Sequence, residues 1–188
     1  MNLNTMVNQL RTKGVKFAES LTKEEIYRIE GIYSIKFPES LCKFYSLGVP
    51  ISEDENGFPC WTDFSEANIA KIKERIQAPF NWLLLDVKKG FWLSNWGKRA
   101  EPINEAIEQF TEVAMKAPQL IPLYSHRYMP QFNGMDDIPV ISAVGRDIIY
   151  YGSNLYEYLY NEFLSNGHFI VNKNCMYVPF WSDIIGNL

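Results

Sequence analysis

The chain has few of the residues that cross-link small proteins or hold metals. Cys42, Cys60 and Cys175 are the three cysteines among 188 residues, and no Cys-x-x-Cys pair of the kind that holds structural zinc is present. His168 and Cys175 have no further ligands at a usual spacing. We therefore predict no metal site, and cysteines that are reduced and packed as small apolar residues.

Long apolar runs are missing as well. No stretch approaches the roughly 18 apolar residues that a membrane-spanning helix needs. The first residues, MNLNTMVNQLRTKG, lack the uninterrupted apolar centre of a signal peptide. These absences predict a cytoplasmic protein that has no membrane segment.

Motifs for several common chemistries are also absent. There is no glycine-rich phosphate loop, no G-x-S-x-G elbow and no H-E-x-x-H. The net charge of −4 argues against a nucleic-acid binder, which normally carries an excess of Lys and Arg on one face. Basic residues between 71 and 99 alternate with apolar positions, and we interpret them as a solvated surface.

The composition instead indicates a well-packed globular domain. Apolar residues make up 47% of the chain and aromatic residues 15%. A chain of this length buries roughly 70% of the surface that its unfolded form exposes. We predict one domain over residues 1–188, with residues 1–20 as an N-terminal helical extension.

Helices dominate the first half. Thr22 and Glu25 form a capping box at the start of one helix, and Pro38 opens the next, which runs to Gly48. A charged loop at 50–61 is predicted to lead into a short strand. Further helices are predicted at 66–76 and 103–117, after Gly152 with a cap near Ser153, and from Pro179.

Short apolar runs indicate strands in the second half. WLLLDV and GFWLS are predicted to form a hairpin around KKG, and QLIPLYSHRY to form one strand. IPVISAVG and DIIYYG are predicted to pair as an antiparallel hairpin. Because helices and strands are segregated along the chain, the predicted class is α+β.

Four strings in this order, DVKKGFWLSNWGKR, APQLIPLYSHRYMP, DIIYYGSNLYEYLYNEF and VPFWSD, resemble bacterial members of the SUKH superfamily, as does the opening LTKEEIYRIEGIYSIKFPESLCKFYSLG. The resemblance covers roughly residues 20–185. It implies a mixed, largely antiparallel curved sheet with helices packed mainly on one face, and no cofactor. Ser125 stands where relatives commonly carry glycine, which predicts that its φ need not be positive.

The resemblance also implies a non-enzymatic protein-binding role. Many bacterial members are immunity proteins that neutralise a toxin domain, often a nuclease, by stoichiometric binding; others are interaction modules linked to cell-wall synthesis. Both roles remain open here. We predict a basic protein partner, and we assign partner binding to Glu53, Asp54, Glu55, Asp136, Asp137 and Tyr151. Solubility is the alternative role for the acidic residues.

The stretch around His126 allows two interpretations. In a hydrolase or ligand-binding protein, His126 is a general base oriented by Asp136, Asp137 or Asp147, with Arg127 stabilising an anion and Tyr124 or Tyr150 donating a proton. In a structural role, strand alternation sends His126 and Arg127 to opposite faces. We favour the structural role and predict no catalytic residues. The structural framework is then Trp92, Trp96, Gly97, His126, Arg127, Asp147, Tyr150 and Trp181.

Overall fold

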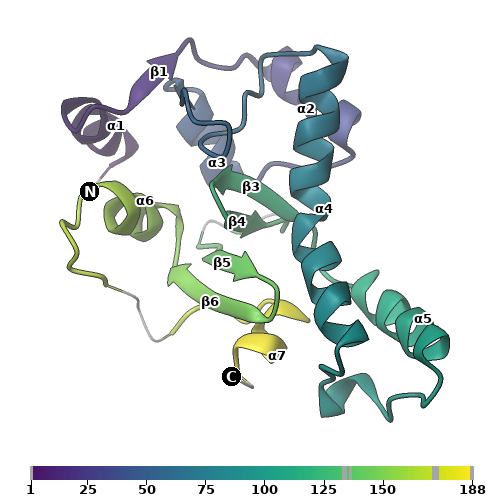
Figure 1. Cartoon of the computed structure of the whole chain (residues 1–188). Helices are drawn as coiled ribbons and strands as arrows, with labels where there is room; N and C mark the ends of the chain where they lie inside the picture. Colours follow the sequence, from purple (N-terminus) through teal and green to yellow (C-terminus); the bar gives the residue numbers. More distant parts are fainter. Residues whose placement is uncertain (1, 133–134, 136, 171–173, 187–188) are drawn as a thin grey trace.

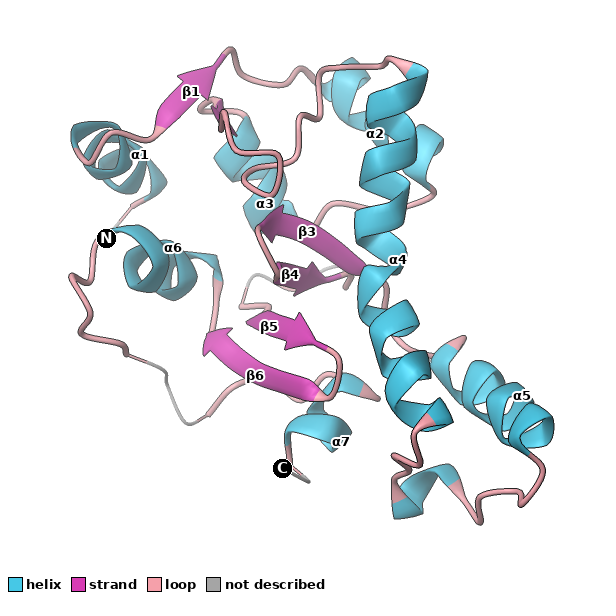
Figure 2. Ribbon diagram, in the orientation of Figure 1, coloured by secondary structure: helices cyan, strands magenta, loops and turns pink. Residues whose placement is uncertain are grey.

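The computed structural model describes residues 2–132, 135, 137–170 and 174–186. It contains a two-stranded and a four-stranded antiparallel sheet surrounded by helices, so the predicted α+β class is confirmed (Figure 1, Figure 2). Within those residues, no helix combines the length and the apolar character needed to cross a membrane.

The described elements follow one another in this order: α1 (Leu3–Thr12), β1 (Lys16–Ala18), α2 (Lys23–Tyr33), α3 (Glu39–Tyr45), β2 (Val49–Ile51), α4 (Glu66–Lys88), a 3-10 turn (Ser94–Trp96), α5 (Ile103–Ala114), β3 (Leu120–Tyr124), β4 (Arg127–Pro130), β5 (Val140–Val144), β6 (Asp147–Gly152), α6 (Leu155–Phe163) and α7 (Trp181–Ile185).

The N-terminal segment is more than a helical extension. Helix α1 buries Leu3, Met6, Val7 and Leu10, which share one face at helical spacing. Strand β1, which the sequence did not predict, then pairs with β2. The charged loop therefore follows a strand, whereas we predicted that it would precede one.

Strands β3, β4, β5 and β6 lie in sequence order in the main sheet. Alternate side chains point to opposite faces. One face contributes Ile121, Met129 and Val140 to a first core cluster. The other face contributes residues such as Tyr128 and Ile141 to a second core cluster. Both faces of the sheet are thus packed.

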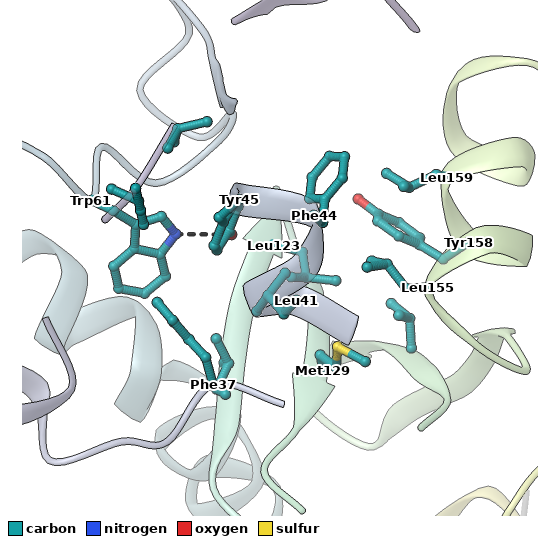
Figure 3. Close-up of a cluster of buried hydrophobic side chains, with 14 of the residues drawn as sticks. Phe37, Leu41, Phe44, Tyr45, Trp61, Leu123, Met129, Leu155, Tyr158 and Leu159 are labelled. Carbon is teal, nitrogen blue, oxygen red and sulfur yellow. Dashed lines mark hydrogen bonds between the residues drawn. The ribbon is translucent and has the colours of Figure 1, made fainter. Parts of the chain in front are cut away.

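Aromatic side chains and one buried hydrogen bond hold the first core cluster together. Trp61 is fully buried, and its Nε1 donates to the hydroxyl of Tyr45 at 3.0 Å (Figure 3). Its ring also meets Tyr33 and Phe37 edge-on. Such pairs add about 0.5–1.5 kcal/mol each beyond the area they bury. This cluster fixes the segment that follows the charged loop.

Helix α4 overturns the predicted hairpin at 82–94. It continues through Pro79 and WLLLDV to Lys88, and GFWLS is a loop that ends in the 3-10 turn. The buried residues Ile72, Ile76, Leu83 and Val87 keep helical spacing across the proline. Leucine is a strong helix former, so packing along this stripe outweighs the local cost of Pro79. Figure 1 shows α4 along one side of the molecule, with α5 beside its C-terminal half.

The predicted single strand QLIPLYSHRY is also wrong, because it is a hairpin. Strands β3 and β4 pair across a turn at Ser125 and His126. Ser125 has φ = 49°, so the prediction that it would avoid positive φ is overturned as well. The serine occupies a left-handed position that glycine adopts without steric cost.

Several aromatic residues assigned to the framework lie in or beside the second core cluster. Trp181 is fully buried, and its Nε1 donates to the carbonyl of Pro118 at 2.8 Å. Trp96 stacks on Phe180 with ring centroids 5.6 Å apart. The Nε1 of Trp92 donates to the carbonyl of Gly97 at 2.8 Å, where φ is 90°. The contacts of Trp96 and Trp92 hold the loop between α4 and α5 in place.

Candidate functional site

Residues 52–56 form an exposed acidic loop with internal hydrogen bonds. The amide of Asp54 donates to Ser52 Oγ at 3.1 Å, and the amide of Asn56 donates to Asp54 Oδ1 at 2.9 Å. Gly57 is buried behind the loop, and a Cβ there would lie 2.2 Å from Ser52 Oγ. Glycine at 57 is therefore what allows the loop to close so tightly.

Aromatic contacts hold the C-terminal end of the acidic loop. Phe58 packs on Tyr124 with ring centroids 4.8 Å apart and on Phe163 with centroids 5.5 Å apart. These two rings come from β3 and α6. The backbone is thus fixed by the core while its acidic side chains face solvent.

The two glutamates of the acidic loop form exposed ion pairs. Glu53 lies 2.6 Å from Lys16, with 89% of its side chain exposed, and Glu55 lies 3.7 Å from Lys71, with 87% exposed. A hydrogen bond and charge attraction from Lys16 lower the pKa of Glu53, so its carboxylate is ionised at neutral pH. Exposed pairs of this kind contribute little to stability, because water and salt screen them.

The acidic loop and the β3–β4 turn, which we treated separately in the sequence, lie side by side. The amide of Ser125 donates to the carbonyl of Asn56 at 2.8 Å. The carbonyl of Ser125 accepts from Nη2 of Arg75 at 3.1 Å. Loop, turn and α4 therefore meet at one place.

A cleft of about 360 Å³ opens at this junction, and we call it the His126 cleft. One face of α4 forms one wall, and the turn and sheet form the other. The lining residues are Asn56, Lys71, Glu74, Arg75, Ala78, Trp82, Ser125, His126, Tyr128 and Val144.

His126 is half-buried in this cleft. Its Nδ1 lies 3.0 Å from the hydroxyl of Ser125. Burial lowers the pKa of His126, and the charge of Arg127 lowers it further, whereas the charge of Asp147 acts in the opposite direction. Among the described residues, the hydrogen bonds of His126 include none to a carboxylate, so nothing there orients it as a general base.

Arg127 points away from His126. Its Nε lies 3.1 Å from Glu162, its Nη1 donates to Ser142 Oγ at 3.0 Å, and its guanidinium lies 3.7 Å over the ring of Tyr151. The two side chains do diverge as predicted, but the reason is the turn and not alternation along one strand. Tyr151, assigned to partner binding, is half-buried beneath this arginine.

The remaining predicted site residues are scattered. Asp137 is exposed, and Asp147 is exposed at the start of β6. Tyr150 bonds to Ser182 on α7, away from His126. Asp136 lies outside the described residues. The proposed catalytic set of histidine, arginine, aspartate and tyrosine is therefore not assembled from the described residues.

Sequence reasoning missed the α4 side of the cleft. Lys71, Arg75, Ala78 and Trp82 recur every three or four residues, which is the spacing of one helix face. That signal was readable, but only if α4 was predicted to continue beyond residue 76.

A larger cavity of about 610 Å³ lies between α4 and α5, and its lining side chains are uncharged, as at Gln77, Asn81 and Gln119.

Cys42 and Cys60 are free cysteines. Burial raises the pKa of the Cys42 thiol and of the Cys175 thiol, which makes both less reactive at neutral pH. Over the described ranges, no group of three His, Cys, Asp or Glu residues is placed to hold a metal ion.

Comparison of the chain with protein-family models, with curated proteins and with solved structures finds no match.

Proposed function

We propose that this chain is a non-enzymatic, cytoplasmic protein-binding domain that neutralises a bacterial toxin by stoichiometric contact, with residues 52–56 on the contact surface. The observation that carries the proposal is the acidic loop, whose backbone is held by hydrogen bonds and by the packing of Phe58 and whose residues are exposed. The resemblance of the sequence to SUKH immunity proteins supplies the toxin as the class of partner.

The hydrogen bonds within the loop favour binding. A loop that is already ordered loses little conformational entropy when a partner docks. Ser52, Asp54 and Gly57 hold the backbone, so Glu53 and Glu55 need only reorient their side chains. Pre-organisation of this kind is typical of surfaces that recognise a fixed partner.

The charges suit a basic partner. Lys16 and Lys71 pair with the two glutamates of the loop in the free protein, but these ion pairs are exposed and weak. Basic side chains of the partner can replace these lysines in the ion pairs at a small cost in free energy. Charge complementarity then increases the association rate and selects the partner.

A toxin encoded beside this gene provides the test. We expect co-expression to restore growth and the two proteins to co-purify. Replacing both glutamates, Glu53→Lys with Glu55→Lys, should slow association about tenfold at low salt and flatten its salt dependence. Surface plasmon resonance at two salt concentrations measures both effects.

The matched control is Glu108→Lys with Glu112→Lys, which makes the same charge change at exposed positions of α5. The control should bind like the wild type. If the loop variant also binds like the wild type, residues 52–56 are not on the contact surface.

A small hydrolase is the second candidate, and the contact between Ser125 and His126 favours it because it places a hydroxyl beside a possible base. His126→Ala separates the two functions. Under the binding proposal, toxin protection stays near wild type; under the hydrolase alternative, a measurable turnover is lost.

A further inference from the structure

Arg75 brings a positive charge into the His126 cleft and has no ion pair among the described residues, although the charge of Asp54 attracts it from farther away. Its side chain is half-buried, and Nη2 donates to the Ser125 carbonyl at 3.1 Å. Across the part of the chain that the structure describes, no carboxylate oxygen lies within 4.0 Å of its guanidinium. Burial lowers the pKa of Arg75. A guanidinium taken from water without a counterion is costly, and it keeps donors that an incoming anion can use.

Lys71 strengthens this end of the cleft. It lies one helical turn before Arg75, and its Nζ is 3.7 Å from Glu55, too far for a strong hydrogen bond. Glu74 also lines the cleft. Because Glu55 already pairs with Lys71, Arg75 is the cation at this end that has no ion pair among the described residues. This end is therefore suited to one acidic group.

The other end of the cleft is apolar. Ala78, Trp82 and Val144 line it. Residues 71 and 82 are eleven positions apart on α4, which corresponds to about 16 Å along the helix axis. The wall formed by α4 thus changes from cationic to apolar along its length.

We propose that the His126 cleft binds a small amphiphilic oxyanion, with a phosphate or carboxylate at Lys71 and Arg75 and an apolar body along Ala78 and Trp82. The volume of about 360 Å³ is in the range of small-molecule sites. Arginine pairs with either oxyanion through two parallel N–H donors. This site does not depend on the protein-binding function, because the ligand is tested in the absence of any partner.

Phenyl phosphate and phenylacetate are suitable probes, because each joins one oxyanion to an aromatic ring. Calorimetry with the full chain should give saturable binding for at least one of them, and the stronger one identifies the acidic group. Phenol, which lacks the charge, and inorganic phosphate, which lacks the ring, should each bind at least about tenfold more weakly, because each meets only one end of the cleft.

Arg75→Gln should weaken binding of the preferred probe by at least about tenfold, since it removes the charge-assisted pair. Lys71→Gln provides a second variant at a more exposed position, so the test survives if Arg75→Gln does not fold. Lys73→Gln is the matched control, because Lys73 is exposed on α4 and does not line the cleft; it should bind like the wild type.

Tryptophan emission adds a positional readout. Trp82 lines the cleft, so the probe should change the emission of the wild type and leave that of Trp82→Phe largely unchanged. The proposal is overturned if neither probe saturates, if phenol binds as tightly as phenyl phosphate and phenylacetate, or if Lys71→Gln and folded Arg75→Gln bind as tightly as Lys73→Gln.

Discussion

Two arginines flank the β3–β4 turn, and their surroundings differ sharply. Arg127 is almost fully engaged: it meets Glu162 and Ser142, and it stacks on Tyr151. Arg75 is half-buried as well, but its hydrogen bond goes to the carbonyl of Ser125, and no carboxylate among the described residues pairs with it.

The difference distinguishes an arginine that stabilises the fold from one whose donors are available to a ligand. A guanidinium whose donors are occupied by its own fold stabilises that fold and offers little to a ligand. A half-buried guanidinium without a counterion adds less to stability and more to recognition. The sequence pointed to Arg127 as the candidate anion stabiliser because it adjoins His126, whereas in the structure Arg75, and not Arg127, lines the His126 cleft.

The largest expected effect is on stability. Arg127→Gln leaves Glu162 as an unpaired, nearly buried carboxylate, and we expect the free energy of unfolding to fall by about 3 kcal/mol. Arg75→Gln should cost about 1 kcal/mol, because it loses one hydrogen bond and also removes an unpaired charge. Urea denaturation monitored by circular dichroism measures both values.

Arg28 provides the control for this contrast, because it is exposed and lies over the ring of Phe64. Arg28→Gln should cost less than about 1 kcal/mol. If Arg127→Gln and Arg75→Gln lower the free energy of unfolding equally, the distinction between the two arginines is wrong.

A smaller loss of stability is expected from a substitution at Ser125, whose carbonyl accepts from Arg75. Ser125 has φ = 49°, and a β-branched side chain is strongly disfavoured there. Ser125→Val should therefore lower the free energy of unfolding by about 2 kcal/mol, while Ser125→Gly should change it by less than about 1 kcal/mol. Thermal denaturation ranks the variants.

Ser46→Val tests whether the cost comes from the backbone. Ser46 is exposed and has φ = −70°, so valine there should cost clearly less than at position 125. Similar losses at the two positions would mean that the left-handed turn is not the source.

The smallest expected effect is on the pH dependence of stability. The pKa of His126 in the folded chain lies below its ordinary value of 6.5. Between these two values the unfolded chain binds a proton that the folded chain does not, so stability falls as pH drops below about 6.5. His126→Gln should reduce this fall, measured as unfolding free energy at pH 7.5 and pH 5.5.

His168→Gln is the comparison for that measurement, because His168 is exposed on a different segment. Its pH profile is the reference for the loss of a histidine outside the cleft. If His126→Gln follows the same profile, the histidine in the cleft makes no contribution to acid sensitivity.

Local signals predicted much of the fold. The capping box of Thr22 and Glu25 is present at the start of α2, and Pro38 precedes α3. The β5–β6 hairpin and the last two helices also lie close to their predicted positions, with Asn154 as the cap of α6 in place of Ser153. These features depend on residues close together in sequence, so the sequence alone specifies them.

The predicted elements were wrong where packing or an uncommon backbone conformation determines the local structure. Pro79 lies inside α4, although proline usually ends a helix, and a turn without glycine concealed the β3–β4 hairpin. The candidate site was harder still, because the hydrogen bond between Asn56 and Ser125 joins residues far apart in the chain. Sequence reasoning found the acidic loop and His126 but had no means to place them together.

The Asn56 carbonyl that accepts from Ser125 makes the acidic loop and the floor of the cleft parts of one mechanical unit. One backbone hydrogen bond thus joins the two places directly. If binding at one place changes the affinity at the other, thermodynamic reciprocity requires the second event to change the first affinity by the same factor.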